Sequence, residues 1–378
     1  MADIAPPAKK QRVAARIAVV GAGSWAQGWH LPHLQCNICA EIAAIVDPCT
    51  TTVDGYAPNM KPPKDVAEHY GVPLFTHIDD FLKSEVAASV HGVIVCTPHH
   101  THFDVGMKVL QAKMHVLMEK PMTTDVAQAR QMAEAASLAG KTFMVNTSAN
   151  FRSQSIQARY MVKNGKVGEV EHVACYMMRE RKFLDTTTLS SWTKPHETML
   201  GNGMAWGQLS HTLSWVLFVT GLSPSTVSCQ MVFSKNTGAD LYDSATIKCD
   251  NGAVINVQGV ASIPGSNSVL DDSSGGKLIE NKIFGTEGCL FYSGDDARPS
   301  SGSLLLRRHD GENTKVEGFY FENTLTDGDG PESLHAFIDG CQGNSFVNAS
   351  DAILGVKVVQ ALEAMYRSAK SGRVENVL

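Results

Sequence analysis

Long apolar runs are missing from this chain of 378 residues, and none reaches the roughly 18–20 residues that a helix needs to cross a bilayer. Residues 1–12 also lack the apolar segment of a secretory signal, so we expect a cytoplasmic protein. An excess of positive charge is absent as well, because the formal net charge is −6. We therefore expect neither nucleic acid nor a membrane as a partner.

A disulfide framework is also not evident. The nine cysteines are odd in number and spread along the chain, which is typical of reduced thiols. Cys36 and Cys39 follow His30 and His33, which raises the alternatives of a metal site or a redox pair. The simpler interpretation is that these residues finish a first helix and the turn after it. We therefore predict no metal.

A glycine-rich turn follows the first apolar segment. Ile17 to Val20 is a short run of apolar residues that predicts a buried parallel strand. Gly21 permits a tight turn, Gly23 leaves room for a pyrophosphate, and Ala26 is the third small residue of a G-x-G-x-x-G/A pattern. The helix that follows would offer its N-terminal amides to phosphate. The alternative is a glycine turn in another kind of α/β protein.

An acidic residue ends the second predicted strand. Residues 41–46 are mostly apolar, and Asp47 follows them. A carboxylate at this position accepts the hydroxyls of an adenosine ribose and repels a 2′-phosphate, so NAD is favoured. Lys61 and Lys64 in the following loop keep NADP open as an alternative.

Strand and helix patterns alternate over residues 13–147, which predicts a doubly wound parallel sheet. A third strand is expected over Val72–Phe75, and a helix from Thr123 or Thr124 to Leu138. The carboxyl ends of parallel strands meet at one edge of the sheet, where ligands bind. The residues predicted at that edge are Gly21, Asp47, Thr97, Lys120 and Asn146.

The pattern changes near residue 150, where helices flank a series of strands separated by turn residues. It predicts an α+β domain with an open, mostly antiparallel sheet. We therefore expect a disordered tail at 1–14, a dinucleotide-binding Rossmann domain at 15–148 and a second domain at 149–378. The basic cluster at residues 9–12 of the tail is a solvated segment or, less simply, a nuclear address.

Two residues are candidates for proton transfer. Lys120 follows a core strand, so its ammonium would point into the cofactor crevice beside a substrate hydroxyl. His211 lies in a predicted helix after a glycine-rich bend. Histidine exchanges protons near neutral pH, although a lone histidine in an apolar helix is more often structural.

Several short motifs together resemble the glucose–fructose oxidoreductase, inositol dehydrogenase and MocA-like family. They occur in order over almost the whole chain after the tail. They are Val20-Gly-Ala-Gly23, Val46-Asp-Pro48, Cys96-Thr-Pro98 with His102, Glu119-Lys-Pro121, Asn150-Phe-Arg152, Gly165-Lys-Val-Gly168, Gly201-Asn-Gly203 with His211, Phe284-Gly-Thr-Glu-Gly288 and Asp351-Ala352.

The resemblance implies hydride transfer between NAD(P) and a carbinol carbon of a sugar, sugar derivative or cyclitol. It implies that Lys120 and His211 are catalytic, that the Lys120–Pro121 peptide is cis, and that the chain forms a homodimer or homotetramer through the open face of the C-terminal sheet. A final helix would pack back near the first domain. The implied cofactor contacts are Gly21, Gly23, Ser24, Trp25, Ala26, Asp47, Thr97, Pro98, His99, His102, Glu119, Lys120 and Asn146. The implied substrate contacts are Lys120, Arg152, Arg179, Arg181, Trp192, His196, Trp206 and His211.

One position departs from the family pattern. Many members carry an Asp four residues before the histidine, and this chain has Gly207 there. Either the Lys–His pair works without a carboxylate, or Asp185 or Glu197 replaces it. Two alternatives to a dehydrogenase therefore stay open. One is an NAD-retaining enzyme that cleaves glycosides without net redox change, and the other is a non-catalytic, NAD-dependent regulatory protein.

Overall fold

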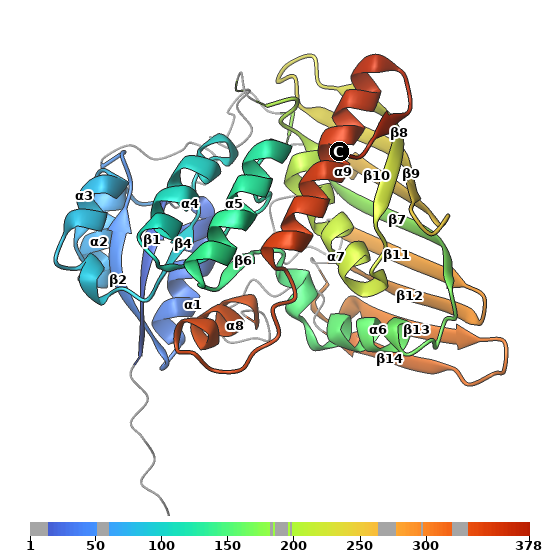
Figure 1. The fold of residues 1–378 in the computed structure, drawn as a ribbon, viewed down its shortest axis with the longest axis horizontal. Coiled ribbons are helices and arrows are strands. Elements are labelled where there is room, and N and C mark those ends of the chain that lie inside the picture. Colours follow the sequence, from blue (N-terminus) through green and yellow to red (C-terminus); the bar gives the residue numbers. More distant parts are fainter. Residues whose placement is uncertain are drawn as a thin grey trace, which may run out of the picture.

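The computed structural model describes residues 14–50, 60–181, 184–185, 196, 199–263, 277–295, 298–319 and 332–378. Two sheets lie side by side, with helices on and between them (Figure 1). Within these described residues, no helix is both long and apolar enough to cross a membrane.

The first sheet has six strands, all paired in parallel. Their spatial order is β3-β2-β1-β4-β5-β6, so the topology reverses between β1 and β4. The strands are β1 (Ala15–Val20), β2 (Ala40–Val46), β3 (Leu74–Phe75), β4 (Gly92–Val95), β5 (His115–Met118) and β6 (Phe143–Val145). The central strands are almost continuously apolar because helices cover both of their faces.

Helices connect these strands. They are the π-helix η1 (Ala26–His30), α1 (Leu31–Cys36), α2 (Pro63–Tyr70), α3 (Ile78–Lys83), α4 (His102–Gln111) and α5 (Val126–Ala139), with 3₁₀ turns η2 (Ala87–Ser89), η3 (His99–Thr101) and η4 (Ser148–Phe151). The predicted start of α5 at Thr123 or Thr124 is wrong, because the Asp125 carboxylate accepts the Gln128 amide and caps the helix there. The third strand is shorter than predicted, since only Leu74 and Phe75 pair with β2.

The second sheet has nine strands in the order β14-β13-β12-β11-β7-β10-β9-β8-β15. They are β7 (Val170–Glu180), β8 (Pro224–Phe233), β9 (Asp240–Cys249), β10 (Val254–Ile263), β11 (Leu278–Gly285), β12 (Gly288–Asp295), β13 (Gly302–Arg308), β14 (Thr314–Phe319) and β15 (Glu375–Asn376). Its pairs are antiparallel except for β7 with β10, among the strands that the structure describes. The predicted fold class is therefore confirmed.

The remaining helices cover one face of this sheet or join the two sheets. They are α6 (Ser153–Lys163), the π-helix η7 (Ala205–Leu209), α7 (Ser210–Thr220), the 3₁₀ turn η8 (Pro299–Ser301), α8 (Glu332–Cys341) and α9 (Ala352–Ser371). Helix α9 packs against both β8 and α5, as Figure 1 shows. Helix α8 lies against the first sheet, where Phe337 and Cys341 leave no room for a Cβ at Gly92.

Candidate active site

The glycine turn after β1 is anchored at one glycine and open at the other. Gly21 has a φ of +90°, and a Cβ there would collide with the Cys96 carbonyl at the end of β4. The Gly21 amide donates to the Val46 carbonyl at 2.8 Å, which ties the turn to β2. A Cβ at Gly23 would have no atom within 4 Å. This open cradle before η1 fits the pyrophosphate of a dinucleotide.

Asp47 supports the same turn from the end of β2. One carboxylate oxygen accepts the Ala22 amide and the other accepts the Cys49 amide, each at 2.8 Å. Burial raises the pKa of Asp47, while these two hydrogen bonds oppose the rise. The Gln27 amide group donates to the carbonyls of Ala22 and Lys61 at 2.7 and 2.9 Å. The loop after β2 is therefore fastened to the glycine turn on the side where a ribose is expected.

The other predicted cofactor residues of the turn lie in different environments. Trp25 is 43% exposed and its ring stacks on Trp29, at the start of η1. Ser24 is partly exposed, and Ala26 is fully buried against the sheet.

The segment after β4 is held by a buried histidine. The His102 ring lies 2.8 Å from the Pro121 carbonyl and 2.9 Å from the Thr97 carbonyl, so it links the ends of β4 and β5. His99 is also buried, and burial lowers its pKa well below the usual value. Pro98 lies between these residues and is partly exposed. Thr97, which the strand pattern predicted at the carboxyl edge of the sheet, thus lies there together with Pro98, His99 and His102, which the resemblance implied.

A buried hydrogen-bonded network underlies that edge at the end of β5. The Glu119 carboxylate lies 2.8 Å from the fully buried His30 ring and accepts from the Asn146 amide group at 2.6 Å. The Ser333 hydroxyl donates to the other end of Asn146 at 2.7 Å. Burial raises the pKa of Glu119, but His30, Lys120 and Asn146 together outweigh it, so the pKa is lowered. The network joins η1, β5, β6 and α8 beneath the predicted nicotinamide position.

Lys120 connects this edge to the second half of the chain. Its peptide bond to Pro121 is cis, and its ammonium donates to the Gly207 carbonyl at 2.8 Å. Gly207 lies in η7, which continues directly into α7, where half-buried His211 follows four residues later. The structure therefore brings the end of β5 to the helix segment that carries His211.

Sequence reasoning did not find the carbonyl partner of Lys120. The absence of a carboxylate at position 207 leaves the backbone oxygen of that residue as the acceptor. Asp185, one suggested replacement, is engaged elsewhere, because it accepts from Ser234, Asn236 and Arg181. Ser234 and Arg181 overcome burial and lower the pKa of Asp185. Glu197 lies outside the described residues.

The predicted substrate residues differ in how far they are buried and in what they contact. Trp206 is fully buried and stacks on Tyr366, so we leave it out of the proposed substrate contacts. Arg152 is buried at the start of α6, and Arg179 is half-buried near the end of β7. The His196 ring stacks on His100 at 4.1 Å between centroids. Trp192 lies outside the described residues.

His33, which precedes Cys36 and Cys39 in the chain, has a hydrogen-bond partner in the backbone. Its ring lies 2.7 Å from the Trp29 carbonyl. No cluster of three metal-ligating side chains occurs among the described residues.

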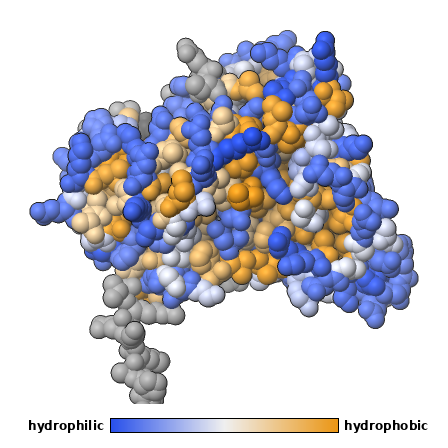
Figure 2. Space-filling model, in the orientation of Figure 1, coloured by the Kyte–Doolittle hydropathy of each residue, from blue (hydrophilic) through white to orange (hydrophobic). Residues whose placement is uncertain are grey.

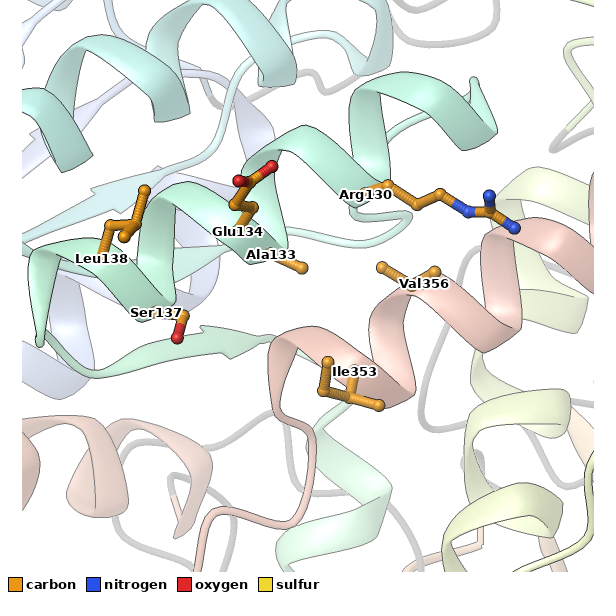
Figure 3. A pocket seen from close by; sticks show the side chains of 7 residues that line it. All are labelled: Arg130, Ala133, Glu134, Ser137, Leu138, Ile353 and Val356. Atoms are coloured by element: carbon orange, nitrogen blue, oxygen red, sulfur yellow. The ribbon is translucent and has the colours of Figure 1, made fainter.

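An apolar groove of about 360 Å³ runs between α5 and α9, where Figure 2 shows apolar surface and Figure 3 shows Leu138, Ile353 and Val356. This groove is remote from the carboxyl edge of the first sheet and carries no catalytic group.

The fold and the glycine turn define the class of protein. A parallel six-stranded sheet whose glycine turn precedes a helix, with a lysine at the end of β5, is that of an NAD-binding oxidoreductase. Residues 15–147 match the family model described as "Oxidoreductase family, NAD-binding Rossmann fold", and residues 155–291 match the GFO/IDH/MocA C-terminal domain. The chain belongs to this family, so it is an NAD(P)-dependent dehydrogenase or reductase.

Relatives match over almost the full length. D-glucoside 3-dehydrogenase of Escherichia coli is 25% identical over 370 residues, which cover 95% of this chain and 97% of the relative. The solved aldose–aldose oxidoreductase of Caulobacter crescentus has a TM-score of 0.72 at 19% identity, covering 96% of this chain and 99% of that one. The WlbA dehydrogenase of Bordetella pertussis, solved with NADH and UDP-GlcNAcA, has a TM-score of 0.71 at 18% identity, covering 96% and 98%. Other curated relatives align over 34–66% of their own length.

Proposed function

We propose that this protein oxidises a carbinol carbon of a sugar, sugar derivative or cyclitol with NAD, or reduces the matching carbonyl, using Lys120 and His211 for proton transfer. The family supports the reaction type. The names of relatives, among them D-glucoside 3-dehydrogenase and inositol 2-dehydrogenase, support the substrate class.

The observation that carries the proposal is the bond between the Lys120 ammonium and the Gly207 carbonyl. It joins residues 87 positions apart and brings the end of β5 to the helix of His211. A substrate hydroxyl placed between the amine and the imidazole would meet both proton-transfer groups at the edge where the glycine turn opens.

The residues at this edge have separate chemical roles in the proposed reaction. Bound NAD would supply the hydride acceptor for the carbinol carbon. Lys120, as a neutral amine, would accept the hydroxyl proton while the carbonyl forms and so become an ammonium, and His211, hydrogen-bonded to the same oxygen, would pass that proton on to solvent. The Gly207 carbonyl orients the Lys120 ammonium without adding a negative charge. Glu119 and Asn146 hold the end of β5 from below.

The proposed cofactor contacts follow the same edge. The Gly21–Gly23 turn and the start of η1 would hold the pyrophosphate, and Asp47 would accept the adenosine ribose hydroxyls. The segment Thr97–His102 and the network of Glu119 and Asn146 would line the nicotinamide end. Since Asp47 is an acid, we propose NAD as the preferred cofactor over NADP.

The test is reduction of the nicotinamide, followed by its near-ultraviolet absorbance, with NAD or NADP and a panel of sugars and cyclitols. We expect reduction with at least one of them, and loss of at least 100-fold in kcat for Lys120→Met, a size typical of a lost acid–base group. Lys163→Met, which changes an exposed lysine at the end of α6, is the matched control. Tight NAD binding with no reduction of NAD by any substrate would refute the proposal. Release of a sugar from a glycoside would then indicate the redox-neutral enzyme.

We further propose a homodimer or homotetramer formed through the open face of the nine-stranded sheet. Aromatic side chains gather there, since Phe284 contacts the rings of His172 and Phe291. We expect Phe284→Glu to lower the mass measured by sedimentation. Tyr160→Glu, at a 65% exposed aromatic residue of α6, is the control. An unchanged mass for Phe284→Glu would refute this interface.

All nine cysteines are free thiols. We propose a cytoplasmic location, which rests on the odd number of cysteines and their scattered positions in the sequence.

A further inference from the structure

A pair of buried carboxyl groups lies under η7, in a part of the molecule that the proposed chemistry does not use. Asp240 and Asp243 stand at the start of β9 and are 0% and 3% exposed. Asp240 accepts the Ala205 amide on one oxygen and the Tyr366 hydroxyl on the other, each at 2.7 Å. It therefore joins η7 to α9.

The backbone around Asp240 is packed too closely for ordinary side chains. A Cβ at Gly203 would collide with the backbone and the carboxylate of Asp240, and one at Gly201 would collide with the Tyr366 ring. The Trp206 ring stacks on Tyr366 at 5.4 Å. The start of η7 is thus pressed against Asp240 and Tyr366 from several sides.

Burial raises the pKa of both carboxyl groups. Burial, followed by the charge of Asp240, raises the pKa of Asp243 well above its usual value. Neither carboxyl oxygen of Asp243 has a hydrogen-bond partner among the residues that the structure describes. Buried ionisable groups of this kind are seldom the best choice for stability alone, because apolar residues of similar volume do as well.

The contact of Asp240 with η7 lies two residues away from the contact of Lys120 with η7. Ala205 is the first residue of η7, and Gly207, two residues later, presents its carbonyl to the Lys120 ammonium. η7 forms the start of the helix that continues into α7, and the first amides of a helix have no partner within it, so tertiary contacts such as that from Asp240 to the Ala205 amide fix its position. Short π-helical segments also occur frequently at functional sites.

We propose that Asp240 is a positioning residue, which holds η7 through the Ala205 amide and the Tyr366 hydroxyl so that the Gly207 carbonyl fixes the Lys120 ammonium. This inference rests on the proposed function for its meaning in catalysis. The placement of Lys120 is measurable without any substrate.

The first experiment reads the placement of Lys120 directly. Trace acetylation with acetic anhydride, quantified by peptide mass spectrometry, gives the reactivity of the Lys120 amine relative to that of Lys315. We expect Asp240→Asn to raise this ratio at least threefold, because the amine loses its fixed acceptor. Tyr366→Phe removes only one hydroxyl and should raise the ratio as well, which keeps the test valid if Asp240→Asn does not fold.

Asp295→Asn is the matched control, since it makes the same change at a buried aspartate of the same sheet. It should leave the acetylation ratio within a factor of about 1.5 of the wild-type value. An unchanged ratio in folded Asp240→Asn and Tyr366→Phe would overturn the proposal. A similar rise in Asp295→Asn would overturn it too, because it would indicate general loosening of the domain.

The second experiment uses the best substrate of the panel. Asp240→Asn should lower kcat roughly tenfold or more while the dissociation constant of NAD stays within about twofold. Equal losses in kcat and NAD affinity would indicate a structural role and overturn the positioning role. If the wild-type protein reduces no NAD with any substrate, the proposed function fails, yet the acetylation ratio still decides whether Asp240 positions Lys120.

Discussion

Alanine substitutions at the two glycines of the turn after β1 should change two different properties, stability at Gly21 and NAD affinity at Gly23. Gly21 has a φ of +90°, and a Cβ there would stand 2.7 Å from the carbonyl carbon of Cys96. The left-handed conformation costs an L-residue about 1–2 kcal/mol. Overpacking against backbone adds about 1–3 kcal/mol. Gly21→Ala should therefore lower the free energy of unfolding by about 2–5 kcal/mol, as measured by urea denaturation.

Gly23→Ala is the matched counterpart, because a Cβ there would meet no atom within 4 Å. Its free energy of unfolding should stay within about 1 kcal/mol of the wild-type value, since relief of glycine's entropy roughly balances any strain. The added methyl group would stand where the pyrophosphate approaches the backbone. We expect the dissociation constant of NAD to rise at least tenfold, which corresponds to about 1.4 kcal/mol.

The assay for NAD affinity is quenching of tryptophan fluorescence, because Trp25 is partly exposed beside the turn. Wild-type stability of Gly21→Ala would refute the close approach of the turn to β4. Wild-type NAD affinity of Gly23→Ala would show that the pyrophosphate does not pass over this glycine. Loss of stability in both variants would mean that the turn is uniformly packed, contrary to the reasoning.

Three further predictions concern single side chains. Lys120→Ala should abolish turnover while NAD affinity is kept, and residual turnover within tenfold of the wild type would remove Lys120 from the chemistry. Asp47→Asn keeps an acceptor for the Ala22 amide but removes the charge that repels a 2′-phosphate. The ratio of NADP to NAD affinity should therefore rise, and an unaltered ratio would show that another residue contacts the ribose. Asp243→Asn should stabilise the protein increasingly as the pH rises above about 4. Folding raises the pKa of Asp243 above its usual value of 3.8, so protonated Asp243 adds its full contribution to the free energy of unfolding below that pH. This contribution is lost as the pH rises through the pKa of the folded state. Urea unfolding at acidic and alkaline pH measures this, and a difference between variant and wild type that does not change with pH would contradict it.

Local patterns predicted the first sheet well. The apolar runs of β1, β4 and β5 are continuous because both faces of these strands are buried, and Gly21, Thr97 and Lys120 follow them at the carboxyl edge of the sheet. The positions of Gly21, Asp47 and Lys120 followed from this arrangement alone. The cis bond before Pro121, implied by the resemblance, is present in the structure.

Other features were predicted incompletely. β9 begins at Asp240, although an aspartate is typical of a turn as long as its buried partners are unknown. Trp206, predicted among the substrate contacts, is buried and stacks on Tyr366. In both cases a side chain's environment depends on a helix more than 100 residues further along the chain.

The sequence by itself determined the parallel sheet, its glycine turn and the edge where a cofactor binds, because each depends on the periodicity of a few neighbouring residues. The tertiary structure alone decided what Lys120 touches and what holds its partner in place. Those contacts join residues 87, 35 and 126 positions apart, from Lys120 to Gly207, Ala205 to Asp240 and Asp240 to Tyr366. Pairings of that kind arise only when elements far apart in the chain pack together, and no local pattern encodes them.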